Sequence, residues 1–121
     1  MERSTETMLR AFLESELARL DAEVAQIEQE GHEALSEASG ENNYRDHMAD
    51  QGTATFSREL DMTLEENVRT ALEAVRKALG RMEEGAYDTC ERCGGPIGEE
   101  RLRAIPTATM CITCKAAEES R

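Results

Sequence analysis

The chain has 121 residues and a net charge of −12, and it is 39% hydrophobic and 33% charged with only 3% aromatic residues. So few bulky apolar side chains exclude a large globular core and favour long amphipathic helices that pack along a narrow seam. Because an acidic chain is repelled by phosphate backbones, we do not expect it to bind DNA directly.

The first predicted element is a long helix from about Ser4 to Ser36. Its apolar residues recur every three or four positions, and charged residues occupy the other faces. Ser4 or Thr5 is suited to cap its start. About 33 residues would give a helix of roughly 50 Å. The apolar stripe consists of Leu9, Leu13, Leu17, Leu20, Val24 and Ile27.

A second apolar stripe starts at Phe56 and predicts another long helix. Gly80 lies inside it, and Gly85 is the predicted stop. The stripe consists of Phe56, Leu60, Leu64, Val68, Leu72, Val75, Leu79 and Met82. A polar connector, at about residues 37–55, separates the two helices. We therefore predict a mainly α fold in which residues 1–84 form an antiparallel coiled-coil hairpin. The same stripes would also fit a homo-oligomeric bundle.

No segment of the sequence is apolar for long enough to be a transmembrane span. The first 20 residues are charged throughout and lack the apolar core of a signal peptide. We therefore expect a cytoplasmic protein with no membrane partner. Disulfides are uncommon in that compartment, where paired CxxC motifs more often bind metal.

All four cysteines lie in two CxxC pairs, within the stretch CERCGGPIGEERLRAIPTATMCITC. Zinc bound by four thiolates needs a tetrahedron of sulfur atoms about 2.3 Å from the metal, and two CxxC turns supply one. Gly94 and Gly95 follow the first pair, where such a turn tends to need a positive φ or close backbone approach. Residues 85–121 are therefore predicted to form a zinc-finger module with a short C-terminal helix. Its one structural zinc ion is bound by Cys90, Cys93, Cys111 and Cys114.

The CxxC motif also occurs in thiol redox proteins. Their thioredoxin-like fold has a strand before the motif, and no strand pattern precedes Cys90. Four filled ligand positions leave none for a substrate or water, so we expect no enzymatic activity. Two alternatives stay open: a thiol-based redox sensor, and a zinc-stabilised coiled-coil adaptor for another protein partner.

The segment GAYDTCERCGGPIGEERLRAIPTATMCITC, preceded by a helical hairpin, resembles the DksA/TraR family of bacterial C4-type zinc-finger transcription regulators. The resemblance implies that the protein binds RNA polymerase. It also implies that the hairpin enters the secondary channel of the polymerase. Acidic residues at the hairpin tip would then act near the catalytic magnesium ion and modulate initiation.

Counted back from the first cysteine, the tip of this chain reads Asp-x-x-x-Asp-x-Gly, where the best-known family pattern is Asp-x-x-Asp-x-Ala. Without gaps, the family's second tip aspartate falls on Asp50 and its small apolar residue on Gly52, whereas its first aspartate falls on His47, next to Asp46. The resemblance therefore implies Asp46, Asp50 and Gly52 as the tip residues that act on the partner. The basic residues that would contact the rim of the channel are Arg101, Arg103 and Lys115.

Some family members also help to bind the alarmone ppGpp at their interface with polymerase. The contributing basic positions on the second helix are occupied here by Asn67 and Ala74. Only the lysine after the last cysteine persists, as Lys115. One base of three supplies little attraction for phosphate, so we do not expect a response to ppGpp.

Overall fold

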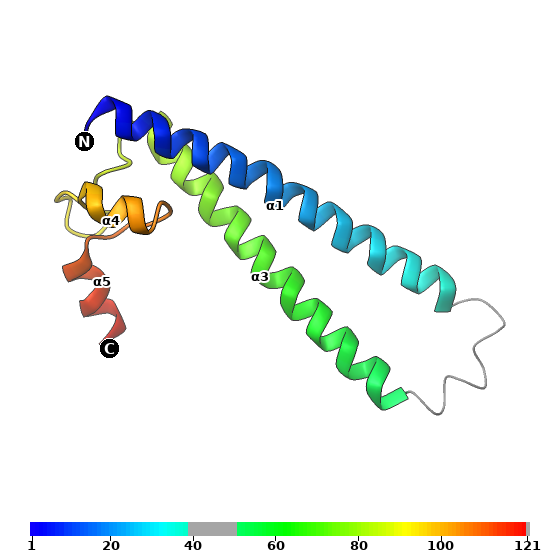
Figure 1. Ribbon diagram of the computed structural model, residues 1–121. Helices are drawn as coiled ribbons and strands as arrows, with labels where there is room; N and C mark the ends of the chain where they lie inside the picture. Colours follow the sequence, from blue (N-terminus) through cyan, green and yellow to red (C-terminus); the bar gives the residue numbers. More distant parts are fainter. Residues whose placement is uncertain (39–50, 121) are drawn as a thin grey trace. The chain divides into compact units, whose positions relative to one another are not determined.

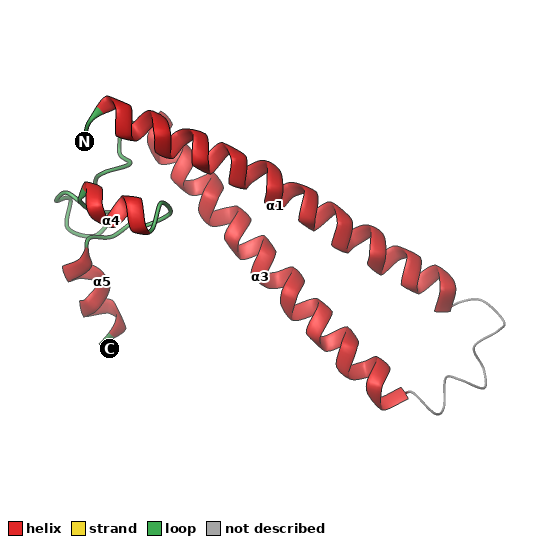
Figure 2. Cartoon of the chain, in the orientation of Figure 1, coloured by secondary structure: helices red, strands yellow, loops and turns green. Residues whose placement is uncertain are grey.

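The computed structural model describes residues 1–38 and 51–120, with side chains for residues 1–30, 59 and 62–120. Within these ranges the chain forms helices and no strand beyond one isolated bridge, between Thr89 and Pro96 (Figure 2). The predicted mainly α fold is therefore confirmed. None of the described helices is long and apolar enough to cross a membrane. The helices are α1 (Arg3–Ala38), α3 (Gln51–Glu83), α4 (Glu99–Ala104) and α5 (Ile112–Glu119) (Figure 1).

Both long helices extend further toward the connector than their apolar stripes predict. The first helix ends at Ala38, and the second begins at Gln51 instead of Phe56. Parts of the predicted loop at 37–55 are therefore helical. The predicted loop was too long, because an apolar stripe marks only the part of a helix that packs against another element. Backbone hydrogen bonds can continue the helix beyond that part.

The end of α3 is set by Gly85, as predicted. Its φ is +75°, in the left-handed region that favours glycine. The Gly85 N–H donates to the Met82 carbonyl at 3.1 Å, and the Ala86 N–H donates to the Arg81 carbonyl at 2.8 Å. These two bonds form a Schellman motif, which satisfies the last carbonyl groups of the helix. The chain therefore leaves α3 sharply and turns into the cysteine-bearing segment.

The chain divides into two compact units. One comprises Met1–Ala18 and Leu72–Arg121, and the other comprises Arg19–Ala71. The first unit thus contains one end of each long helix together with the whole cysteine-bearing segment. Residues on both sides of position 84, where we expected a domain boundary, share this unit.

The core of the first unit joins the helix seam to the cysteine module. Leu13 of α1 and Leu102 of α4 are completely buried. The prediction for the seam is confirmed at most positions within this unit, while Leu17 and Leu79 are half-buried. The other buried apolar residues of the unit are Leu9, Leu72, Val75, Ala78, Met82, Tyr87, Cys90, Ile97 and Ala108.

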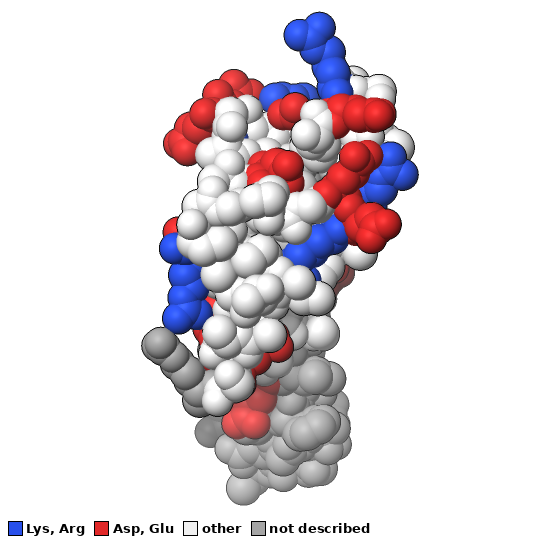
Figure 3. All heavy atoms as spheres, turned by 90° about the vertical axis from the view of Figure 1, so that its left-hand side faces the viewer, with Lys and Arg blue, Asp and Glu red and all other residues white. Residues whose placement is uncertain are grey.

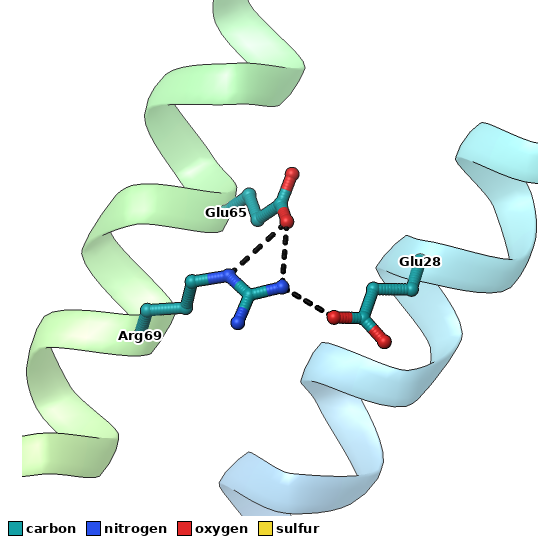
Figure 4. Close-up of polar contacts among 3 residues, drawn as sticks. All are labelled: Glu28, Glu65 and Arg69. Carbon is teal, nitrogen blue, oxygen red and sulfur yellow. Dashed lines mark hydrogen bonds and ion pairs between the residues drawn. The ribbon is translucent and has the colours of Figure 1, made fainter.

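The second unit is held by a thinner seam. Leu20 is buried there, but Leu64 is 50% exposed, so its predicted place in the seam was wrong. Arg69 of α3 donates to Glu65 of the same helix at 2.9 Å and also forms an ion pair with Glu28 of α1 (Figure 4). This ion pair links Arg69 of α3 to Glu28 of α1, one residue after the end of the α1 stripe at Ile27.

Candidate metal centre

The first cysteine pair is held in a tight turn by its own backbone. The Gly94 N–H donates to the Cys90 carbonyl at 3.0 Å, and the Cys90 N–H donates to the Gly95 carbonyl at 2.7 Å. Gly94 has a φ of +75°, which a residue with a side chain adopts only with strain. The Gly95 N–H points at Cys93 Sγ, 3.4 Å away. The turn therefore presents both sulfur atoms on one side, as expected for a metal-binding loop.

The second pair starts α5. Cys111 has extended backbone angles and precedes the first helical residue, Ile112. The Lys115 N–H donates to the Cys111 carbonyl at 3.0 Å, which winds the second CxxC into the first turn of the helix. Arg101 of α4 supports the approach to this pair, because its Nε donates to the Met110 carbonyl at 2.9 Å.

The four sulfur atoms meet although 17 residues separate the pairs. All four Sγ atoms lie within 4.8 Å of one another, and those of Cys93 and Cys111 are 3.9 Å apart. A tetrahedral site with Zn–S bonds of about 2.3 Å separates its sulfur atoms by about 3.8 Å. The cluster therefore fits one zinc ion. Its four protein ligands would leave no open position for catalysis.

Backbone amides around the cluster favour thiolates. Hydrogen bonds from the amides of Cys93 and Cys111 lower the pKa of Cys90 to about 6. The amide of Cys114 likewise lowers the pKa of Cys111. The Cys114 thiol shares a hydrogen bond with Cys111 and is partly desolvated, which raises its pKa to about 12. Four thiolates at this distance need a cation between them, and a divalent metal ion supplies that charge.

A polar cluster joins α4 to the start of α1. Thr5 is 3% exposed, and its hydroxyl donates to Glu99 Oε1 at 2.7 Å. Arg103 donates to the same hydroxyl at 3.2 Å and to Glu99 at 2.9 Å. Thr5, which we expected to cap a helix, therefore lies inside α1 and connects it to the cysteine module.

A second polar cluster joins the first cysteine turn to α3. Glu91 Oε2 accepts from Lys77 Nζ at 2.9 Å, and Glu91 Oε1 accepts from the Thr109 hydroxyl at 3.0 Å. The hydrogen bond from Lys77, followed by that from Thr109, lowers the pKa of Glu91. Arg81, one turn after Lys77, donates to the carbonyl oxygens of Thr89 and Ala86. Sequence reasoning missed these clusters, because contacts between single distant residues leave no periodic pattern.

The comparisons with known proteins agree with this geometry. Residues 85–120 match the prokaryotic dksA/traR C4-type zinc finger. Over 96 residues the chain is 33% identical to the RNA polymerase-binding transcription factor DksA of Caulobacter vibrioides, which covers 79% of this chain and 68% of that protein. This chain belongs to the DksA/TraR family. Its four clustered cysteines form the structural zinc site of that family, as the sequence predicted.

One further relative and one solved structure show how much of the chain is similar to known proteins. The chain is 42% identical over 89 residues to General stress protein 16O of Bacillus subtilis, which covers 72% of this chain and 55% of that protein. It thus spans about half the length of that relative. The structure of transcription factor DksA2 from Pseudomonas aeruginosa matches with a TM-score of 0.76 at 29% identity, over 100% of this chain and 88% of that one.

The three basic residues predicted at the rim of a polymerase channel lie in or beside the DksA/TraR zinc finger. Arg101 and Arg103 both have partners within the unit, so they stabilise the zinc finger as well. Lys115 is half-buried in α5. Their contacts with a partner stay a prediction.

The predicted tip lies mostly outside the described residues. Asp46 and Asp50 both fall in the range 39–50, whereas Gly52 is the second residue of α3. The role of these three residues therefore stays a prediction.

Charge is sparse on part of the zinc finger. The run from Ala104 to Cys114 contains no charged residue, in a chain with 33% charged residues. In the view from the side of α4 and α5, uncharged atoms cover the middle of the face, and acidic and basic side chains gather nearer its edges (Figure 3). Ile105 and Ile112 in this run are 46% and 70% exposed.

Proposed function

We propose that this protein is a bacterial transcription regulator that binds RNA polymerase and has no enzymatic activity of its own. The observation that carries the proposal is the 33% identity to a protein named as an RNA polymerase-binding transcription factor, over 79% of this chain. The match to DksA2 over the full chain supports the same function, since it extends the likeness beyond the zinc finger. The expected place of action is the cytoplasm.

The proposed mode of binding uses the hairpin as a probe. Helices of 36 and 33 residues, with their connector, would enter the secondary channel of the polymerase. The carboxylates of Asp46 and Asp50 would then lie near the active-site magnesium, where their charge biases the mobile elements around it. Gly52 would allow close approach of the backbone. The net charge of −12 keeps the protein off DNA and suits a channel lined with basic groups.

The zinc finger has a supporting role in this proposal. It shares one compact unit with residues 1–18 and with α3 from Leu72 onward. Contacts from α4 to Thr5 and from the first cysteine turn to Lys77 hold it to both long helices. The zinc ion stabilises that unit, so that Arg101, Arg103 and Lys115 are presented together at the rim of the channel.

The proposal is tested by binding to purified core RNA polymerase. A photo-crosslinking side chain is placed either at position 52, near the tip, or at Ser120, beyond α5. We expect the first protein to label polymerase peptides inside the secondary channel and the second to label its outer rim. Failure of the full chain to bind core polymerase would contradict the proposal and favour an adaptor for another protein. Binding with position 52 labelling only the outer surface would contradict entry into the channel.

A further inference from the structure

Glu91 is not one of the four ligands, but its side chain contacts both α3 and the segment before the second cysteine pair. It follows Cys90 directly and uses both carboxylate oxygens, one for Lys77 of α3 and one for the Thr109 hydroxyl. Its backbone N–H also donates to the Thr109 carbonyl at 2.9 Å. We propose that Glu91 is a positioning residue of the zinc site, which holds the second cysteine pair against the first and ties both to α3.

The contacts between Glu91 and Thr109 bridge the two halves of the site. Glu91 is one residue after Cys90, and Thr109 is two residues before Cys111. One bond between their backbones and one between their side chains fix both the position and the rotation of the segment before Cys111. A zinc site tolerates deviations of only about 0.2 Å in ligand distance. A residue that fixes this segment therefore raises the affinity for the metal.

The contact with Lys77 extends the support to a long helix. Arg81 donates to the Thr89 carbonyl just before the first cysteine turn, and Lys77 binds Glu91 within that turn. These two residues are one helical turn apart on α3, so one face of the helix supports the turn at two points. The side chains of Lys77 and Glu91 are 55% and 37% exposed, so water and salt weaken their ion pair. Thr109 carries no charge, so salt weakens its hydrogen bond to Glu91 less than it weakens the ion pair.

The test is the zinc affinity of the full chain, measured by competition with a chromophoric chelator. Glu91→Ala removes every side-chain contact, and its zinc affinity is expected to fall roughly tenfold, as for other residues that orient ligands. Glu91→Gln keeps an acceptor for the Thr109 hydroxyl and loses the exposed ion pair and hydrogen bond with Lys77, so it is expected to retain affinity within about threefold. Glu100→Ala, which removes an exposed acid from the same module, is the matched control and is expected to match wild type.

Cobalt substitution provides a readout of ligand geometry. Tetrahedral thiolate-bound Co²⁺ has visible absorption bands that weaken and shift when the ligands move. Glu91→Ala is expected to change these bands, whereas Glu91→Gln is expected to keep them as they are in wild type. Wild-type zinc affinity and an unchanged cobalt spectrum in Glu91→Ala would overturn the proposal. Equal losses of zinc affinity in the Ala and Gln variants would overturn it too, because the hydrogen bond from the Thr109 hydroxyl would then not be what positions the site.

If Glu91→Ala fails to fold, Thr109→Val tests the same contact from its other side. It keeps the shape of the side chain and removes only the hydroxyl that donates to Glu91. Its zinc affinity is expected to fall several-fold, and by more than in Glu91→Gln, because the Gln variant keeps the hydrogen bond that Thr109→Val removes. Wild-type zinc affinity in Thr109→Val would overturn the assignment.

Discussion

The hydroxyl of Tyr87 donates a hydrogen bond to the carbonyl oxygen of Pro106 across 2.7 Å, at a site where Tyr87 is only 2% exposed. This bond connects the segment that leaves α3 to the loop between α4 and the second cysteine pair. The zinc finger is thus closed at the cysteine cluster and also at Tyr87. Metal and core packing support the same arrangement.

Tyr87→Phe is expected to lower the free energy of unfolding by about 1–2 kcal/mol at neutral pH, because a buried carbonyl loses its partner. Burial raises the pKa of Tyr87 to about 12, with Glu6 and Asp88 adding to it. The tyrosine ionises near pH 10 when unfolded, so wild type loses stability as the pH rises from about 10 toward 12, whereas the Phe variant does not. By about pH 11 the wild-type advantage is expected to shrink by about 1 kcal/mol. Urea unfolding at several pH values measures the difference in free energy of unfolding between wild type and Tyr87→Phe. A difference that stays constant with pH would contradict a buried, neutral Tyr87.

Two glycines near the end of α3 are expected to respond in opposite directions. Gly85 has a φ of +75°, so Gly85→Ala is expected to cost about 1–2 kcal/mol. Gly80 lies inside the helix, and a Cβ added there meets nothing within 4 Å. Gly80→Ala is therefore expected to stabilise by about 0.5–1 kcal/mol. Thermal unfolding of the two variants checks both signs, and destabilisation by Gly80→Ala would mean that its surroundings are more crowded than described.

The seam is tested by two adjacent residues on α1. Leu13 is completely buried, so Leu13→Ala is expected to cost about 2–5 kcal/mol. Phe12 is larger but 50% exposed, and Phe12→Ala is expected to cost about 1 kcal/mol or less. Urea denaturation followed by circular dichroism measures both. If Phe12→Ala costs as much as Leu13→Ala, the seam does not follow the face of α1 that holds Leu13.

Cys93→Ser is expected to abolish stoichiometric zinc binding, because it removes one of four thiolate ligands. The loss should unfold α4 and α5 first and leave most of the signal from α1 and α3, which have their own seam. Metal analysis and circular dichroism measure the two effects. Thr113→Ala, an exposed change within the second CxxC, is the matched control and should keep its zinc. A folded Cys93→Ser protein with a full zinc content would rule out the four-cysteine site.

The sequence was most informative where a local motif predicts one feature of the structure. Paired CxxC motifs predicted the ligand cluster. Gly85 predicted the end of α3, and the structure shows it there with a positive φ. Periodicity found the seam but failed for Leu64, because a period of apolar residues marks a face of a helix and does not show whether another element covers that face.

Contacts between distant polar residues could not be predicted from the sequence. Thr5 and Glu99 meet across 94 positions, and each has many equivalents elsewhere in a chain this rich in charge. Only the folded backbone selects which of these pairs form. The role of Glu91 was missed for the same reason.

The proposed function makes the tip of the hairpin the part of the protein that regulates transcription. The most direct test is an initiation assay with purified RNA polymerase at saturating protein, beside a measurement of binding to core polymerase. Asp50→Asn keeps the size of the side chain and removes its charge. We predict that wild type changes transcript yield, while Asp50→Asn binds polymerase nearly as well and loses most of the effect. Wild-type regulation by Asp50→Asn would contradict the tip mechanism, and bound wild-type protein without any effect on transcription would contradict the regulatory function itself.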